Sequence, residues 1–279
     1  MLRIAVVSGK GGVGKTTVAA NLAAAIAPCT LYDCDVEEPN AHHYLPFDSQ
    51  ACASATVLRP VVDEDRCTHC GACSAFCRHR ALAVLPSSVL LFAHNCVSCG
   101  GCAMVCPEAA IAEVPVPIGT LRHGTSGSVT LVQGSLSVGE ARAPPLIKVV
   151  KQEDGPGPAL LDAPPGSSCP AVETLKGCDY AILVTEPTSF AFHDLTAIAD
   201  VVSESGIPHG VLINRDGAPC PELHAFLSRR GIPLLGSLPM SRDIARIGSE
   251  GGLLVRSDPA VWVPFFASIY ETVRRQVGK

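Results

Sequence analysis

The sequence has little of what membrane insertion, secretion or nucleic-acid binding requires. Its 279 residues include 21 Lys and Arg against 26 Asp and Glu, so no excess of positive charge indicates a nucleic-acid or anionic membrane surface. No apolar run approaches the roughly 20 residues that span a bilayer. No basic segment followed by an apolar segment stands at the N-terminus, as a secretory signal would require. We therefore expect a cytoplasmic protein whose partners are neither nucleic acid nor membrane.

Cysteine, glycine and apolar residues are plentiful instead. The chain has 14 cysteines and 25 glycines, and 47% of its residues are hydrophobic, which is enough for a sizeable core. Disulfides are rare in the cytosol, so cysteines in this number are expected to bind metal. The length suits one large domain with a small insert.

The order of expected elements is typical of a parallel α/β sheet. Residues 2–8 form an apolar strand, residues 15–27 an alanine-rich helix ending before Pro28, and residues 30–35 a second strand with acidic residues at its carboxyl end. Apolar strands separated by helical stretches return at 158–166, 179–188, 210–217 and 232–239. Between these two parts, residues 128–139 are expected to form a hairpin or edge segment, and Pro144 to begin a short helix.

A glycine-rich loop follows the first strand and fits G-x-x-x-x-G-K-[ST] from Gly9 to Thr16. Its glycines let backbone N–H groups turn toward phosphate oxygens at the start of a helix. In this motif Lys15 reaches the β- and γ-phosphates and the Thr16 hydroxyl binds Mg²⁺. The alternative is a glycine-rich turn that binds nothing. The strand before the loop and the helix after it favour the phosphate site.

The loop "SGKGGVGKTT" also contains a second lysine, Lys10. With it the loop resembles the deviant Walker A loop of the MinD/ParA/Mrp superfamily of P-loop ATPases, which includes the nitrogenase iron protein. The resemblance implies a mostly parallel sheet flanked by helices and a face-to-face pair of ATPase subunits, either a homodimer or a pair with a paralogous ATPase. Lys10 would then reach the partner's nucleotide, where a cation neutralises charge on the transferred phosphoryl group. The alternative is a solvent-exposed lysine.

Further segments resemble the same superfamily and cover nearly all of the chain outside the cysteine-rich region. "YDCDVEEPN" resembles switch I, with Asp35 as the residue that orients water and Asp33 in reserve. "LLDAPPG" resembles Walker B with switch II, so Asp162 would hold Mg²⁺ through water and the Gly166 N–H would sense the γ-phosphate. Asn214 matches the position that reads adenine. Residues 238–252 resemble the base-binding segment, although Ser241-Arg242 departs from its usual acidic choice.

These matches define the candidate residues for ATP/ADP and Mg²⁺. The catalytic candidates are Lys10, Lys15 and Asp35, and Mg²⁺ is assigned to Thr16 and Asp162. The nucleotide-binding candidates are Gly9, Lys10, Gly11, Gly12, Val13, Gly14, Lys15, Thr16, Thr17, Asp162, Gly166, Asn214 and Arg215.

An internal repeat carries the cysteines. Residues 65–84 align without a gap with residues 94–113, and each copy contains C-x₂-C-x₂-C-x₃-C, the run of bacterial ferredoxins with two [4Fe–4S] clusters. The fourth cysteine of each run binds the other cluster. One cluster is assigned to Cys67, Cys70, Cys73 and Cys106, and the other to Cys96, Cys99, Cys102 and Cys77. Zinc is the alternative metal, but triplets with two-residue gaps suit a cubane better than a tetrahedral site.

The repeat divides the chain. We expect an ATPase domain formed by residues 1–58 and 115–279 and a small ferredoxin-like α+β insert at 59–114. One position departs from the ferredoxin run, because Pro107 follows Cys106 but Arg78 follows Cys77. A nearby cation would raise the potential of its cluster.

Two further features of the sequence can each be interpreted in two ways. Cys169 follows Asp162 at the offset of a cluster ligand in the nitrogenase iron protein, but no second cysteine completes such a site, and a small residue in a switch loop is the alternative. Residues 262, 266, 269, 270, 273 and 277 form an apolar stripe on one helix face. MinD binds membrane with such a helix, whereas packing on the sheet explains the stripe equally well.

The main functional hypothesis is an ATPase whose dimer cycle gates electron transfer, or delivery of metal or iron–sulfur units, to a redox or metal-cofactor partner. The second is a MinD- or ParA-like positioning protein with structural or redox-sensing clusters. The third is an electron carrier with a decayed ATPase, which the intact site residues disfavour. No C-x-x-C motif follows residue 106, which disfavours an Mrp-type cluster scaffold.

Overall fold

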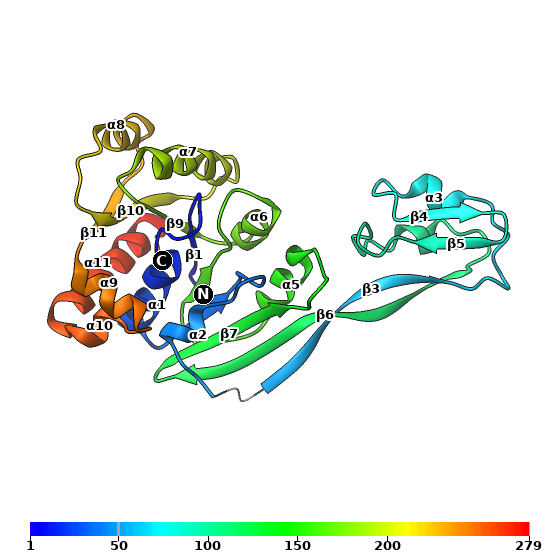
Figure 1. The fold of residues 1–279 in the computed structure, drawn as a ribbon, viewed down its shortest axis with the longest axis horizontal. Helices are drawn as coiled ribbons and strands as arrows, with labels where there is room; N and C mark the ends of the chain where they lie inside the picture. The colour runs from blue at the N-terminus through cyan, green and yellow to red at the C-terminus, as the bar shows by residue number, and fades with distance from the viewer. Residues whose placement is uncertain (49–50, 279) are drawn as a thin grey trace. The chain divides into compact units, whose positions relative to one another are not determined.

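The computed structural model describes residues 1–48 and 51–278, which divide into two compact units (Figure 1). The first unit comprises Met1–Ala53, Leu121–Ser135 and Ile147–Lys279, and the second comprises Ser54–Thr120 and Leu136–Leu146. Residues 59–114, predicted as the insert, all lie in the second unit.

A mostly parallel sheet confirms the predicted fold class; its strands from β11 to β2 lie in the first unit, and β3 and β6 belong in part to each unit. Every neighbouring pair from β11 to β7 is parallel. The strands follow one another in the order β11 (Leu234–Pro239), β10 (His209–Asp216), β9 (Tyr180–Thr185), β1 (Arg3–Val7), β8 (Ala159–Asp162), β2 (Cys29–Asp33), β7 (Val129–Leu136), β6 (Ile111–Ser126) and β3 (Ala51–Val62).

Helices cover both faces of this sheet, which explains why β1 is apolar at nearly every position. Ile4 and Val6 belong to a core shared with α1 (Lys15–Ile26) and α11 (Pro259–Val277). Ala5 and Val7 belong to a second core shared with α7 (Ser189–Glu204) and α8 (Pro221–Arg230). Side chains alternate between the faces of a strand, so a strand covered on both sides needs apolar residues throughout.

The remaining helices of the first unit are short. They are α2 (Ala41–Tyr44), α6 (Cys169–Leu175), α9 (Arg242–Ser249) and α10 (Leu254–Ser257). Helix α5 (Ala143–Val150) begins where the prolines predicted it.

The apolar stripe of the C-terminal helix packs on the core. Phe266, Ile269 and Val273 are buried there, and Trp262 and Tyr270 pack against them. Across residues 1–48 and 51–278, no helix combines the length and hydrophobicity needed to cross a bilayer.

The region between residues 111 and 136 differs from the prediction. Residues 129–136 were expected in a hairpin or edge segment, and β7 does follow β6 after a two-residue connection, but it lies inside the sheet between β2 and β6. The 16-residue strand β6 was not predicted, because Pro115 and Pro117 interrupt its pattern and proline is unfavourable in a strand interior.

The second unit contains a small hairpin and two short helices. Strand β4 (Leu82–Leu85) pairs antiparallel with β5 (Ser88–Leu91), and α3 (Ala72–Phe76) and α4 (Gly101–Met104) lie in the two sequence repeats. Its core includes Cys73, Leu82 and Ile111. The two cysteine-containing loops therefore fold around a small hydrophobic core.

Candidate functional site

The glycine-rich loop joins β1 to α1 at the carboxyl end of the sheet. Gly12 and Gly14 have φ of 80° and 89°, a left-handed conformation that favours glycine. Gly14 directly precedes α1, and a Cβ there would collide with the Asn214 amide. Val13, buried between these glycines, anchors the loop in the core. The loop backbone is thus fixed in the form that directs N–H groups toward an anion.

Lys15, Thr16 and Asp162 form one buried cluster at the end of this loop. Lys15 Nζ donates to Asp162 Oδ1 at 2.7 Å, and Thr16 Oγ1 donates to Asp162 Oδ2 at 2.6 Å. Asp162 is fully buried, and the two donors are 7% and 8% exposed. The carboxylate at the end of β8 therefore holds the two side chains that the motif assigns to phosphate and to Mg²⁺. A hydroxyl beside a carboxylate is an oxygen donor set that suits Mg²⁺.

The two acidic residues after β2 have different environments. Asp33 is fully buried and accepts hydrogen bonds from the Asn40 and Ala41 N–H groups and from Gln133 Nε2, each at 3.0 Å. Burial, and then the charge of Asp162, raise the pKa of Asp33. Asp33 is therefore engaged in holding the chain after β2.

Asp35 instead lines an open cleft. Burial raises the pKa of Asp35 to about 6, against the opposing charge of Lys15. A carboxylate with a pKa of about 6 is ionised at neutral pH and can accept a proton slightly below neutral pH. Such a group suits the role of orienting water. Of the two candidates, the geometry favours Asp35.

The cleft has a volume of about 620 Å³ and brings together much of the predicted nucleotide site. The predicted site residues that line the cleft are Lys10, Gly11, Gly12, Gly14, Lys15, Thr16, Thr17, Asp35 and Arg215. Residues 248–251, within the segment that resembles a base-binding region, also line it.

Several lining residues were not predicted. They are Glu38, Asn40, His43, Tyr44 and Pro165. The Tyr44 hydroxyl lies 2.9 Å from Thr17 Oγ1, and a Cβ on Gly251 would lie 2.6 Å from the His43 carbonyl oxygen. Glu38 and Asn40 lie in the segment that resembles switch I and Pro165 in the one that resembles switch II, although none of them was assigned a role. No motif marks His43 and Tyr44, which reach the cleft because α2 packs beside the loop.

Asn214 and Gly166 make contacts within the protein at this site. Asn214 Nδ2 donates to the Val13 carbonyl at 2.8 Å, and Asn214 Oδ1 accepts from the Arg215 N–H. Arg215 pairs with Glu186 at 2.6 Å. The Gly166 N–H donates to the Ser8 carbonyl at 2.9 Å. It stays a prediction that Asn214 recognises adenine and that the Gly166 N–H contacts the γ-phosphate. The Gly166 contact requires the hydrogen bond between the Gly166 N–H and the Ser8 carbonyl to break.

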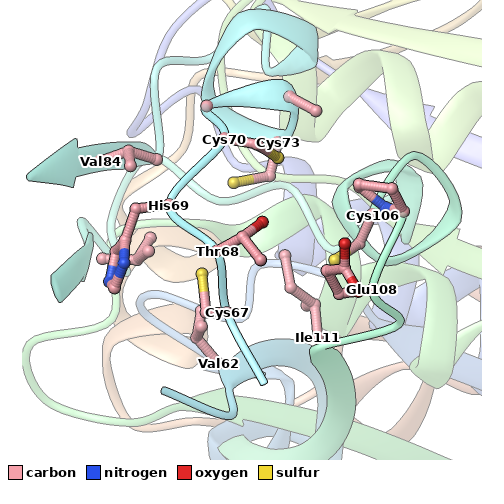
Figure 2. Close-up of a pocket in the computed structure, with 14 residues that line it drawn as sticks. Val62, Cys67, Thr68, His69, Cys70, Cys73, Val84, Cys106, Glu108 and Ile111 are labelled. Carbon is pink, nitrogen blue, oxygen red and sulfur yellow. The ribbon is translucent and has the colours of Figure 1, made fainter. Parts of the chain in front are cut away.

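The eight repeat cysteines gather in two pockets of the second unit. Cys67, Cys70, Cys73 and Cys106 line one pocket, and Figure 2 shows their side chains around it. Cys77, Cys96, Cys99 and Cys102 line the other. Each pocket thus contains three cysteines of one repeat and the last cysteine of the other, the grouping assigned to two clusters.

The backbones of the two repeats match at positions 29 residues apart. Left-handed conformations recur at His69 and Ser98, at Gly71 and Gly100, and at Arg80 and Ala109. The Ala81 N–H donates to Cys77 Sγ and the Ala110 N–H donates to Cys106 Sγ, both at 3.3 Å. Hydrogen bonds of this kind stabilise thiolates that bind iron.

The donor chemistry of the second pocket fits an iron–sulfur cluster. Ser98 Oγ is buried in its wall and has no hydrogen-bond partner among the described residues. A sulfur atom of a cluster could accept a hydrogen bond from this hydroxyl. Four thiols, an unpartnered hydroxyl and apolar walls are the surroundings that such a cluster needs.

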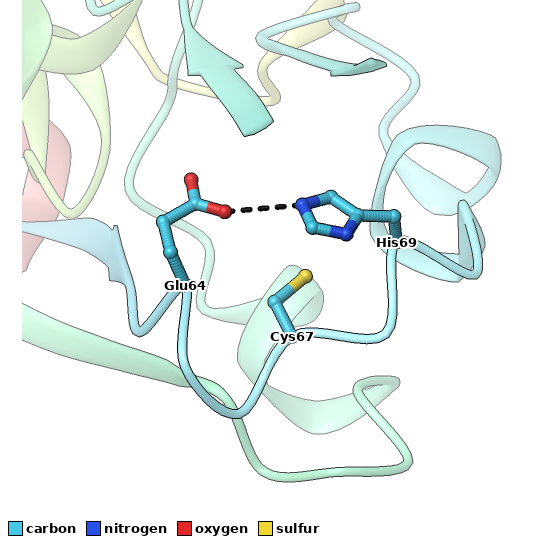
Figure 3. Close-up of side chains that lie close together, drawn as sticks. All are labelled: Glu64, Cys67 and His69. Atoms are coloured by element: carbon cyan, nitrogen blue, oxygen red, sulfur yellow. Dashed lines mark hydrogen bonds and ion pairs between the residues drawn. The ribbon is translucent and has the colours of Figure 1, made fainter. Parts of the chain in front are cut away.

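At the corresponding position of the first repeat, His69 Nε2 lies 3.2 Å from Glu64 Oε2, with Cys67 beside the pair (Figure 3). Ligand atoms of these three residues lie within 4.8 Å of one another. Cys67 also faces the four-cysteine pocket, so this group adjoins the first cluster site.

Cys169 is exposed at the start of α6. Its role stays a prediction.

The fold and the cleft define a P-loop protein. The glycine-rich loop, Asp35 and residues 248–251 line one cleft, whose volume suits a nucleotide. The model of the CobQ/CobB/MinD/ParA nucleotide binding domain matches residues 4–255, and the chain belongs to this family.

Similar proteins agree with this assignment. The chain is 32% identical over 225 residues to an uncharacterized protein of Methanocaldococcus jannaschii, covering 78% of this chain and 79% of that protein. It is 48% identical over 52 residues to an iron-sulfur cluster carrier protein of Pyrococcus horikoshii, covering 17% and 18% of the two chains. The structure of the septum site-determining protein MinD of P. horikoshii with Mg-ADP covers 99% of this chain and 97% of that chain, with a TM-score of 0.59 and 20% identity.

Proposed function

We propose that the protein is an ATP-hydrolysing iron–sulfur protein. Its ATP-dependent homodimerisation is coupled to electron transfer, or to metal or iron–sulfur cofactor assembly, on a partner protein. One observation carries the proposal: a single chain has a nucleotide cleft lined by Lys10, Lys15 and Asp35 and two pockets that each contain four cysteines.

The residues at the phosphate end of the cleft would have distinct tasks in hydrolysis. The loop N–H groups and Lys15 would bind the phosphates, Thr16 would hold Mg²⁺, and Asp162 would hold it through water. Asp35 accepts a hydrogen bond from the water that attacks the γ-phosphorus, while the bond from that phosphorus to the ADP oxygen breaks. Lys10 lies on the cleft wall and supplies a cation to the nucleotide of the facing subunit.

Within the first unit, α2 and the residues beside it connect the nucleotide loop to β7. On one side, Tyr44 bonds Thr17 of the nucleotide loop. On the other, His42 Nδ1 lies 2.9 Å from Gln133 Nε2 in β7, and Gln133 also donates to Asp33. A shift of α2 on nucleotide binding therefore acts on β7.

Phe47, three residues after α2, extends this contact to β6. The Arg122 guanidinium lies 5.2 Å from the centre of the Phe47 ring, and a Cβ on Gly124 would collide with that ring. Strand β6 begins at Ile111, only five residues after Cys106. Because β6 belongs to the second unit at Ile111 and to the first at Arg122, we expect a shift of α2 to act on the strand that continues from the last cysteine of the second repeat.

The decisive experiment measures anaerobic ATP hydrolysis by the iron-replete protein with its clusters oxidised and then reduced, alongside Lys10→Ala. A rate that changes with cluster oxidation state and falls in Lys10→Ala supports coupling across a closed dimer. Equal rates in both states, with cluster potentials unaffected by nucleotide, refute the coupling. Iron and sulfide analysis of the same samples tests cluster binding separately.

A positioning ATPase of the MinD or ParA kind is the second candidate, favoured by the family match and by the MinD fold. Its clusters would be structural or would sense redox state. The two candidate functions differ in what the ATP-bound protein binds. Co-sedimentation of the ATP-bound protein with anionic vesicles, at a rate of hydrolysis independent of cluster state, would favour positioning.

A further inference from the structure

The second cysteine pocket opens into a space bounded by exposed apolar side chains. Its volume is about 580 Å³, and Phe76, Val97 and Leu82 contribute to its wall. Phe76 is 50% exposed and Val97 40% exposed. A Cβ on Gly101 would collide with the Phe76 ring, so that ring rests closely on α4. A rigidly held, half-exposed aromatic ring at the mouth of a pocket is typical of a contact surface for another protein.

An exposed basic segment adjoins the same opening. Arg78 and His79 line the pocket and Arg80 follows them in the chain; all three are exposed. Neither arginine has an ion pair or side-chain hydrogen bond within residues 1–48 and 51–278. One carboxylate, Glu113, also lines the pocket, beside Gly100. In the pocket wall Arg78 balances Glu113, and the exposed Arg80, two residues further along the chain, adds a second positive charge to this segment, although the whole chain has a net charge of -5.

The duplicated repeat provides an internal comparison for this charge. Arg78, His79 and Arg80 of the first repeat correspond to Pro107, Glu108 and Ala109 of the second. Glu108 lines the other pocket, where His69 is paired with Glu64. Two nearly identical ligand frameworks thus differ in the charge around them, and the loop geometry of the ligands cannot account for that difference.

We propose that the opening of the second cysteine pocket, lined by Phe76, Arg78 and Val97, forms with the exposed Arg80, two residues along the chain from Arg78, the docking surface for an acidic partner protein that exchanges electrons with the cluster there. The inference rests on the proposed iron–sulfur function. Carboxylates of the partner pair with the two free arginines, and an apolar side chain packs against Phe76 and Val97. Opposite charges steer the encounter, so binding weakens as salt screens them.

The test uses iron-replete full-length protein under anaerobic conditions and two fluorescein-labelled peptides, one with a phenylalanine flanked by glutamates and the other with the glutamates replaced by lysines. Fluorescence anisotropy is measured in 50 mM and 300 mM NaCl. We expect the acidic peptide to bind more tightly than the basic peptide, with affinity falling roughly tenfold or more between the two salt concentrations.

Charge reversal locates the surface. Arg78→Glu with Arg80→Glu should weaken the acidic peptide at least roughly tenfold. The matched control, Arg229→Glu with Arg256→Glu, changes the same charge at exposed arginines of α8 and α10 and should leave binding unchanged. Phe76→Ala should weaken binding without altering its salt dependence.

Equal binding of the two peptides, or equal effects of the two charge reversals, would overturn the docking surface. Iron and sulfide content and the electron paramagnetic resonance spectrum of each sample report on the clusters separately. Absence of clusters would refute the proposed function, whereas two clusters without charge-selective binding would refute only this inference. Binding of the acidic peptide should also perturb the spectrum of one cluster and leave the other unchanged.

Discussion

Replacing Asp162 by asparagine tests the central contact of the nucleotide site. Asp162 is fully buried and accepts from Lys15 at 2.7 Å and from Thr16 at 2.6 Å. Asparagine has nearly the same volume, so no cavity forms. The Lys15 ammonium, however, stays 93% buried without its counter-ion, because its exposed fraction is 7%.

The size of the effect follows from the burial of the pair. Removing one member of a buried ion pair costs about 3–5 kcal/mol, because the remaining charge is uncompensated. Two effects reduce this cost here. Asparagine keeps one acceptor oxygen, and loss of the Asp162 charge relieves Asp33, whose pKa that charge helps to raise. We therefore expect Asp162→Asn to lower the free energy of unfolding by about 2–4 kcal/mol, a large part of the stability of a typical domain.

Urea unfolding without nucleotide, followed by far-ultraviolet circular dichroism, measures this change. Lys15→Met and the double variant complete a thermodynamic cycle. Because Lys15→Met removes the uncompensated charge, the double variant should be more stable than Asp162→Asn alone. A loss below about 1 kcal/mol in Asp162→Asn, or a double variant that shows simple additivity, would refute the ion-pair reasoning.

Three further predictions concern catalysis, coupling and redox chemistry. Protonated Asp35 is a weaker hydrogen-bond acceptor than the carboxylate and cannot take a proton from water; with its pKa raised to about 6, ATP hydrolysis should be full above pH 7 and fall as pH drops through 6, as a pH–rate profile would record. Phe47→Ala should preserve ATP hydrolysis but abolish its dependence on cluster oxidation state, because the contact with Arg122 and Gly124 is lost. Arg78→Pro should lower the potential of the second cluster only, since reduction adds negative charge beside the lost cation, as a potentiometric titration would show.

Each of these has a matched comparison. Glu38→Gln removes another carboxylate of the cleft and should retain the pH profile, so a loss of the profile there would contradict the assignment to Asp35. Phe190→Ala, at an exposed ring of α7, should leave coupling intact. Equal shifts in both cluster potentials on Arg78→Pro would mean that the substitution acts through folding of the unit instead of local charge.

The parts of the molecule governed by local sequence could be predicted. The glycine-rich loop, the apolar strands around it and the cysteine spacing each express a local geometric requirement. The structure brings Lys15 and Thr16 to Asp162, which lies 146 residues beyond Thr16, because β1 and β8 are neighbouring parallel strands. The motifs predicted this meeting, since they assign all three residues to one ligand.

The parts decided by tertiary packing could not be predicted. Strand β6 contains Pro115 and Pro117, and its length becomes evident only beside its neighbours. Strand β7 includes polar residues and a glycine among its apolar ones, yet it lies inside the sheet, where buried Gln133 hydrogen-bonds Asp33. Tyr44 belongs to no motif and reaches Thr17 through the packing of α2. A single sequence contains no local signal for such long-range pairs.

The parallel pairing of β2 with β7 also sets an order of events during synthesis. Strand β2 ends at Asp33, but its neighbour begins at Val129, after both cysteine repeats have left the ribosome. Strand β1 likewise pairs only with β8 and β9, which follow later still, so both early strands have open edges until then, and such edges are prone to wrong pairing. Gln133, which secures Asp33, arrives equally late. All eight repeat cysteines have therefore been synthesised before the nucleotide site can be completed, and the second unit can begin to fold before the sheet of the first.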